Sequence, residues 1–185
     1  TGRSRPVEIE VPHDIFAKND SVVLTEPGNV SVLKGDSADL DRAAKLLGEA
    51  KNPIIFVGGG VVTTGSSGKL DELADMLQAP TIMSTNGKGA LSSRNYLAHP
   101  VIAGYELIEK ADVILALGTR FVLPGPVSWP VSPEQKLIRI DIDPEEINRN
   151  IEPDLKKIQG MTGEEILLQF YESIELKKDK FGWSS

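Results

Sequence analysis

Residues 53–60, PIIFVGGG, indicate the fold of this chain more directly than any other stretch. The four apolar residues from Ile54 to Val57 are typical of a strand buried on both faces of a sheet. The three glycines behind them suit a sharp strand-to-helix turn. Upstream, apolar residues recur at helical spacing from Leu40 to Ala50, and Ser37 is the expected N-cap of that helix. A helix is therefore followed by a buried strand.

The same alternation of apolar strands and amphipathic helices continues downstream. Further strands are expected at 81–84, 113–117 and 137–142, with a short edge strand at 157–159. Helices are expected around 70–77, 101–110 and 163–175, and His99-Pro100 is expected to form a turn. This alternation predicts an α/β fold, a parallel Rossmann-like sheet with helices on both faces.

The first 36 residues do not follow this pattern. Val7, Ile9 and Val11 alternate with glutamates, which predicts a strand that ends at Pro12. Residues 12–36 show no sustained period, and so long a linker is uncommon inside a compact domain. We expect residues 1–36 to be a strand and linker from a preceding unit, 37–176 to be the α/β domain, and 177–185 to be a tail or the start of a linker. The missing initial Met indicates a fragment or a processed chain.

Composition excludes several classes of function. The chain has no cysteine and two histidines, which excludes disulfides, thiolate catalysis and Cys- or His-rich metal centres. A net charge of −7 argues against nucleic acid as a partner. No apolar run approaches the ~20 residues that span a bilayer. We expect a soluble, cytoplasmic protein that handles small molecules.

In parallel sheets, ligands bind outside the carboxyl ends of the strands. The glycines at 58–60 lack the G-x-G-x-x-G spacing because Thr63 stands where the last glycine would be. They could admit a phosphate to the backbone, or they could only form a tight turn. Arg120 could pair with a diphosphate or form an ordinary surface salt bridge. Asp141 is expected to accept from a ribose hydroxyl, whereas Asp143 is expected to cap a helix.

No residue of the chain is predicted to be catalytic or to bind a metal. Gly35-Asp36-Ser37 has some likeness to a diphosphate–metal motif, but it follows no strand and lacks the downstream Asn pair. Neither histidine has an obvious nucleophile or acid as a catalytic partner.

Four segments occur in a characteristic order: NPIIFVGGGVV at 52–62, APTIMSTNGKGAL at 79–91, ADVILALGTRF at 111–121 and KLIRIDIDPEEI at 136–147. Together they resemble the central domain of the thiamine-diphosphate enzymes of the acetolactate synthase, benzoylformate decarboxylase and oxalyl-CoA decarboxylase group. The opening RPVEIEVPHD at 5–14 resembles the last strand and exit of the preceding pyrimidine-binding domain.

This resemblance implies a subunit of three domains, with thiamine diphosphate and Mg²⁺ held between the two outer domains of different subunits. The full-length enzyme would then be a homo-oligomer, a dimer or tetramer. It would act on a small 2-oxo acid as a decarboxylase or carboligase, through the cofactor's thiazolium ylid. The activating glutamate and the diphosphate–magnesium motif would lie in the outer domains, so the isolated chain is expected to be inactive.

Some members of this group hold FAD in the central domain, and others hold ADP, at the strand ends. The matching positions here are Gly58, Gly59, Gly60, Ser84, Thr85, Asn86, Gly118, Arg120 and Asp141. Three departures from the family pattern leave FAD, ADP or no ligand open. The Gly-rich segment after His-Pro is shortened to Ala103-Gly104-Tyr105, Val122 replaces an Asp, and Gly160-Met161 replaces a Gly-Asp.

Two alternatives stay open at this level. One is a free-standing NAD- or FAD-binding domain of the electron-transfer flavoprotein type, which has a similar sheet. The other is a structural spacer that separates two catalytic domains and binds nothing.

Overall fold

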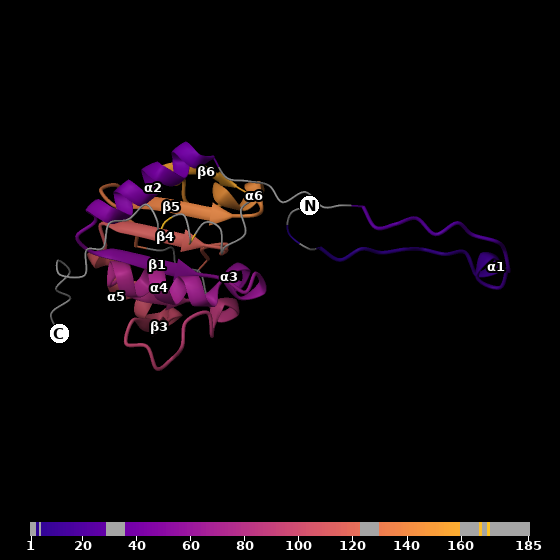
Figure 1. Ribbon diagram of the computed structural model, residues 1–185, viewed down its shortest axis with the longest axis horizontal. Helices are drawn as coiled ribbons and strands as arrows, with labels where there is room; N and C mark the ends of the chain where they lie inside the picture. Colours follow the sequence, from indigo (N-terminus) through magenta and orange to yellow (C-terminus); the bar gives the residue numbers. More distant parts are fainter. Residues whose placement is uncertain are drawn as a thin grey trace.

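The computed structural model describes residues 3, 5–28, 36–122, 130–159, 167 and 170. Their main body is a sheet of six strands in the order β3-β2-β1-β4-β5-β6, and every neighbouring pair is parallel (Figure 1). The strands are β1 (Pro53–Val57), β2 (Thr81–Met83), β3 (Ala98–Pro100), β4 (Val113–Leu117), β5 (Lys136–Asp141) and β6 (Leu155–Gln159). The four expected apolar strands and the expected edge strand are confirmed.

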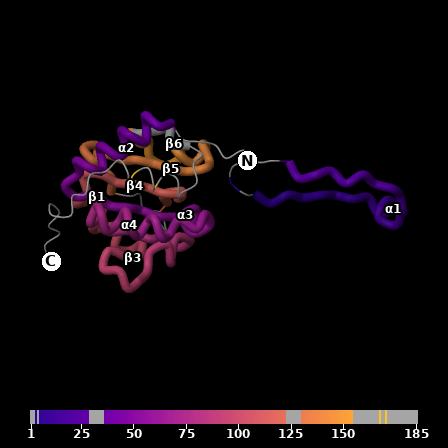
Figure 2. The backbone as a smooth tube through the Cα atoms, in the orientation of Figure 1, coloured from indigo at the N-terminus to yellow at the C-terminus, as the bar shows by residue number. Residues whose placement is uncertain are grey.

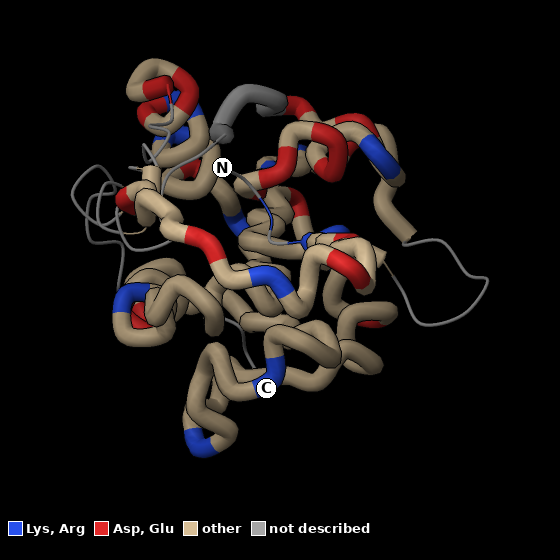
Figure 3. The backbone as a smooth tube through the Cα atoms, turned by 90° about the vertical axis from the view of Figure 1, so that its right-hand side faces the viewer, with Lys and Arg blue, Asp and Glu red and all other residues tan. Residues whose placement is uncertain are grey.

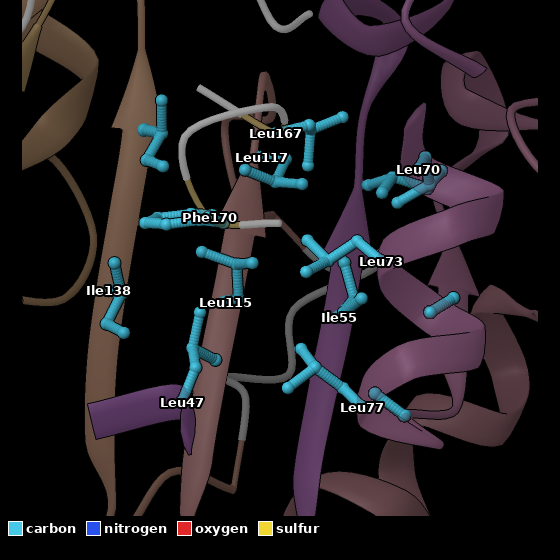
Figure 4. Close-up of a cluster of buried hydrophobic side chains, with 14 of the residues drawn as sticks. Leu47, Ile55, Leu70, Leu73, Leu77, Leu115, Leu117, Ile138, Leu167 and Phe170 are labelled. Carbon is cyan, nitrogen blue, oxygen red and sulfur yellow. The ribbon is translucent and has the colours of Figure 1, made fainter. Parts of the chain in front are cut away.

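Helices cover both faces of this sheet, as the alternating pattern predicted. On one face, Ile55 and Val57 of β1 lie in a cluster with α2 (Ser37–Glu49) and α4 (Ser67–Leu77). On the other face, Ile54 and Phe56 lie in a second cluster with Ile108 of α5 (Gly104–Lys110). Successive residues of β1 point to opposite faces, so a strand buried on both faces must be wholly apolar. Figure 4 shows the first cluster between the strands and α4.

Short helices lie in the connections between these elements. They are α3 (Gly59–Thr63), the 3₁₀ turns η1 (Thr85–Gly87) and η2 (Val101–Ala103), and α6 (Pro144–Ile147). The expected helix at 101–110 is thus divided into η2 and α5. Of the helix expected at 163–175, only Leu167 and Phe170 are described, and both are helical and buried in the first cluster. The 177–185 tail lies outside the described residues.

Two local expectations are wrong. The N-cap of α2 is Asp36 rather than Ser37, because the Asp36 carboxylate accepts from the N–H of Ala38 at 2.9 Å. His99-Pro100 is not a turn but part of β3, where His99 is in register with Ile82 of β2. A proline is tolerated there because β3 is an edge strand, so one side of its backbone needs no donor.

The N-terminal segment 5–28 also differs from its expected structure. It is exposed throughout, and it leaves the sheet as a long arm with α1 (His13–Phe16) at its tip (Figures 1 and 2). The strand expected at Val7, Ile9 and Val11 is not formed. A strand needs a partner for its N–H and C=O groups, and among the described residues no backbone hydrogen bond pairs residues 5–11 with another strand. The side chains of Val7 and Ile9 are 86% and 82% exposed.

Candidate functional site at the carboxyl edge of the sheet

All the positions singled out from the sequence lie at one edge of the sheet. Gly58 follows β1, Ser84 follows β2, Gly118 follows β4, and Asp141 ends β5. Since the strands are parallel, these ends share the edge that carries α3 and α6 (Figure 1). Figure 3 faces this edge and shows acidic and basic stretches of backbone close together. It is the edge where ligands of open α/β sheets bind.

The glycine-rich turn lies where the strand order reverses, between β1 and β4. The Gly58 N–H donates to the carbonyl of Leu117 at 2.9 Å, and the Gly60 N–H donates to the carbonyl of Gly118 at 3.1 Å. A Cβ on Gly58 would lie 2.3 Å from the Gly118 oxygen. Gly118 itself has a φ of +51°, which disfavours other residues. Gly58, Gly60 and Gly118 are therefore required for two backbones to cross closely.

The loop after β2 packs against this crossing. A Cβ on Gly59 would lie 3.2 Å from the Cβ of Asn86. The Ser84 hydroxyl accepts from the Gly87 N–H at 3.1 Å and so caps η1. Thr85 and Asn86 are exposed beside it. The structure thus brings Gly58–Gly60, Ser84–Asn86 and Gly118 together.

Arg120 belongs to the turn that follows β4. Its side chain is exposed, while its main-chain carbonyl accepts from the amide of Asn150 at 2.8 Å. Thr119 and Phe121 on either side are buried. The guanidinium is therefore available at the edge on a turn whose backbone is held in place.

Asp141 ends β5 as a buried carboxylate, 4% exposed. Its Oδ1 accepts from the Asp143 N–H at 3.0 Å and lies 3.6 Å from the Arg3 guanidinium, but its buried Oδ2 has no hydrogen-bond partner among the described residues. Burial raises the pKa of Asp141 although Arg3 and Arg139 oppose the rise. Asp143 caps α6 as expected, since its Oδ1 accepts from the Glu145 N–H at 3.1 Å. Asp141 therefore keeps one buried acceptor oxygen without a partner among the described residues.

A cavity of about 440 Å³ opens beside this strand end. It is lined by three arginines and three acids: Arg3, Arg5, Arg149, Asp143, Glu145 and Glu146. Arg3 approaches Glu146 at 3.5 Å and Asp143 at 3.9 Å, and Arg5 lies 3.3 Å from Asp143. The buried Oε2 of Glu146 has no partner among the described residues. The base of the N-terminal arm thus supplies cations to an acidic strand end.

Two residues at this edge were missed from the sequence. Arg139 of β5 is 1% exposed and donates to the carbonyls of Ile147 and Thr119 at 3.0 and 3.1 Å. A single arginine inside the apolar strand 137–142 was a usable signal, because a buried cation requires partners. Arg3 carried no comparable signal, since its contacts are with residues far along the chain.

The described residues do not place three or more His, Asp or Glu side chains where they could share a metal ion. Within the same part of the chain, no helix combines the length and apolar character needed to cross a membrane.

A parallel sheet in this strand order, with a glycine crossing at the reversal point and a carboxylate on the next strand end, defines a Rossmann-like α/β domain. A family model described as "Thiamine pyrophosphate enzyme, central domain" matches residues 40–167. The chain therefore belongs to the thiamine pyrophosphate enzyme family, as a central domain.

Known relatives agree with this family. A sulfoacetaldehyde acetyltransferase from Roseovarius nubinhibens is 39% identical over 156 residues, covering 78% of this chain and 26% of the relative. An acetolactate synthase from Mycobacterium avium is 31% identical over 169 residues, covering 84% of this chain and 27% of the relative. The chain thus spans less than a third of these relatives.

A solved structure shares the fold. It is the X-ray structure of an enzyme described as thiamin diphosphate-dependent, isolated from Mycobacterium smegmatis. The TM-score is 0.70 at 21% sequence identity, and the match covers 85% of this chain and 31% of that one.

Proposed function

We propose that this chain is the central domain of a larger thiamine-diphosphate-dependent enzyme that decarboxylates a 2-oxo acid and transfers the resulting two-carbon unit. The observation that carries the proposal is the family match over 40–167, which covers the whole sheet and its glycine crossing. The relative named as acetolactate synthase supports this class of reaction, and the relative named as sulfoacetaldehyde acetyltransferase supports the transfer of a two-carbon unit. The enzyme would work as a soluble, cytoplasmic homo-oligomer, a dimer or tetramer, with Mg²⁺ bound beside the cofactor diphosphate.

Assay of the full-length protein tests this proposal. With pyruvate, thiamine diphosphate and Mg²⁺ it should release CO₂ and form acetolactate, and omission of either cofactor should abolish the reaction. A parallel assay with sulfoacetaldehyde and phosphate distinguishes the acetyltransferase activity. The isolated chain should bind neither cofactor and show no turnover. Activity on sulfoacetaldehyde alone would keep the two-carbon transfer but overturn the decarboxylation of a 2-oxo acid, and inactivity on both substrates with cofactors present would overturn both.

We also propose that FAD or ADP binds across the carboxyl edge. The buried Asp141 Oδ2, which has no partner among the described residues, supports this because a ribose hydroxyl would satisfy it. The exposed Arg120 guanidinium suits the diphosphate, since charge-assisted bonds are the strong ones. The Gly59–Asn86 contact, at the ends of β1 and β2, would then extend the floor of the site on the side of Arg120 away from Asp141.

Titration with FAD and ADP at two salt concentrations tests the nucleotide site in the full-length enzyme. Arg120→Ala should weaken binding about ten- to hundredfold and reduce its salt dependence. Asp141→Asn should weaken nucleotide binding less than Arg120→Ala does, because an amide oxygen still accepts one hydrogen bond. Arg94→Ala, which removes another exposed arginine, is the matched control.

The same titration judges the alternatives. If wild type and Arg120→Ala bind equally well, the proposed orientation is wrong. If the wild type binds neither nucleotide, the domain is a structural spacer. NAD binding, or an FAD that remains redox-active without thiamine diphosphate, would favour the electron-transfer flavoprotein alternative.

A further inference from the structure

The turn that carries Arg120 contains an unusual backbone conformation. Phe121 has a φ of +52°, in the left-handed region that bulky residues rarely adopt. Such a conformation persists only where surrounding contacts hold it, and it clusters at ligand sites. One local contact is the Phe121 N–H, which donates to the Thr119 hydroxyl at 3.0 Å. A single bond of this kind does not account for the whole turn.

Arg139 makes the main contacts that hold this turn on its buried side. Its Nη2 donates to the carbonyl of Thr119 at 3.1 Å, and its guanidinium carbon lies 5.9 Å from the centre of the Phe121 ring. The Phe121 ring also packs edge-on against Phe56 of β1, with ring centres 5.2 Å apart. The second guanidinium bond, from Nη1 to the carbonyl of Ile147 at 3.0 Å, ties the same side chain to α6.

Asn150 holds the turn from its outer side. Its amide donates to the carbonyl of Arg120 at 2.8 Å and approaches the carbonyl of Phe121 at 3.4 Å. Arg139 and Asn150 together therefore engage three consecutive carbonyls of the turn. Both lie in the segment from β5 to just after α6, so the strand end that carries Asp141 also fixes the turn that carries Arg120.

The burial of the charged Arg139 side chain costs free energy, and packing alone does not explain why an arginine stands at this position. Burial disfavours the guanidinium charge and lowers the pKa of Arg139, although the nearby charges of Asp141 and Glu146 oppose this. An apolar side chain of similar volume would avoid that cost. Such a side chain could not donate to the Thr119 carbonyl.

We propose that Arg139, with Asn150, is a positioning residue that fixes the Thr119–Phe121 turn, so that Arg120 meets an anionic ligand already oriented. This inference rests on the proposed nucleotide site. The ligand contact belongs to Arg120, and Arg139 and Asn150 act through the backbone that carries it. A held turn removes part of the ordering cost of binding.

Trypsin digestion of the native full-length protein tests the held turn without any nucleotide. Arg120 is exposed, so the held turn, which keeps Phe121 buried, protects the bond that follows Arg120. Asn150→Asp, which keeps the shape but loses the donor, and Arg139→Lys should both increase cleavage after Arg120 severalfold. Cleavage after the exposed Arg94 should not change, and Asn148→Asp is the matched surface control. Equal rates after Arg120 in all four proteins would overturn the proposal.

A double-mutant cycle with ADP tests the link to the ligand. Asn150→Asp and Arg139→Lys should each weaken ADP binding about three- to tenfold, the size expected for restored side-chain and backbone freedom. In an Arg120→Ala background neither change should have any further effect, whereas a general loss of fold would lower affinity in both backgrounds. Equal losses in both backgrounds would overturn the positioning role. If the wild type binds no nucleotide, the proposed nucleotide site fails, and the trypsin result alone decides whether the turn is held.

Discussion

The two halves of the carboxyl edge differ in composition: one is formed by glycine backbone and the other by charged side chains. At the β1–β4 crossing, Gly58, Gly60 and Gly118 bring backbones together, and the Gly58 and Gly60 N–H groups are bonded within the chain. At the end of β5, charged side chains gather around a cavity, and the buried oxygens Asp141 Oδ2 and Glu146 Oε2 have no partner among the described residues.

The β1–β4 crossing and the β5 end therefore differ in what their residues do. The crossing has no room for an added atom, so its residues mainly determine whether the sheet forms. The β5 end keeps two buried acceptors without a partner among the described residues, whereas the polar groups of a packed core are normally hydrogen-bonded. Substitutions in the two halves should therefore differ in size and in pH dependence.

The largest effect is expected at the crossing. Gly58→Ala would place a Cβ 2.3 Å from the Gly118 oxygen, so one of the two backbones must move. We expect a loss of about 3 kcal/mol in the free energy of unfolding, measured by urea denaturation. Gly68→Ala is the control, because a Cβ there meets nothing within 4 Å and should stabilise α4 by about 0.5–1 kcal/mol. Equal stability of Gly58→Ala and wild type would contradict the view that the β1–β4 crossing, unlike the β5 end, determines whether the sheet forms.

Asp141→Asn should produce a smaller change that depends on pH. Because its pKa is raised by burial, Asp141 binds a proton more tightly in the folded state than in the unfolded state. The carboxylate therefore destabilises the fold increasingly as pH rises from the usual Asp range through the raised value. As the pH rises through this range, the free energy of unfolding of the variant should increase relative to that of the wild type. The increase should be about 1.4 kcal/mol for each unit by which folding raises the Asp141 pKa.

Denaturation curves between pH 3 and 8, chosen to bracket roughly the usual Asp range, would measure this gain. At the acidic end the two proteins should have similar stability, because a protonated Asp and an Asn are both neutral. A stability difference that stays constant over the whole range would show that Asp141 is not perturbed in the folded protein.

The smallest effect is expected for Arg3→Ala. Arg3 is partly exposed and its contacts with Asp141 and Glu146 are long, so we expect a loss below about 1 kcal/mol. Removal of this cation should raise the pKa of Asp141 further, measurable by carbon NMR of its carboxyl group. Arg5→Ala, with its more exposed side chain, should leave that pKa closer to its wild-type value. A fall in the Asp141 pKa after Arg3→Ala would contradict the cavity geometry described above.

Much of the fold was predictable because buried parallel strands must be apolar. β1 and β4 each appear as a run of such residues, β5 appears as a run interrupted by Arg139, and their alternation with helices indicated the sheet. β3 was missed because a three-residue edge strand containing His99 and Pro100 carries no apolar run. The N-cap was misplaced by one residue because Asp36 and Ser37 are both good capping residues, and only the backbone geometry distinguishes them.

The site was less predictable than the fold. The strand ends were found from the glycines and from Asp141, since parallel topology brings such ends together. That Gly58 and Gly60 pack against Gly118 could not be found, because the contact joins residues far apart in the chain. Arg3 was missed for the same reason. The arm at 5–28 carries a good strand pattern, but its pairing depends on a neighbour that the sequence pattern does not specify.

The strand order also has a consequence for the synthesis of the chain. β1 lies between β2 and β4, yet β4 emerges from the ribosome only after β2, β3 and α5. Until then one side of a wholly apolar strand offers unpaired N–H and C=O groups, which is a template for association with other chains. A nascent or truncated chain that ends before Val113 should therefore aggregate or recruit chaperones. Solubility should return once Leu117 has emerged and the centre of the sheet can close.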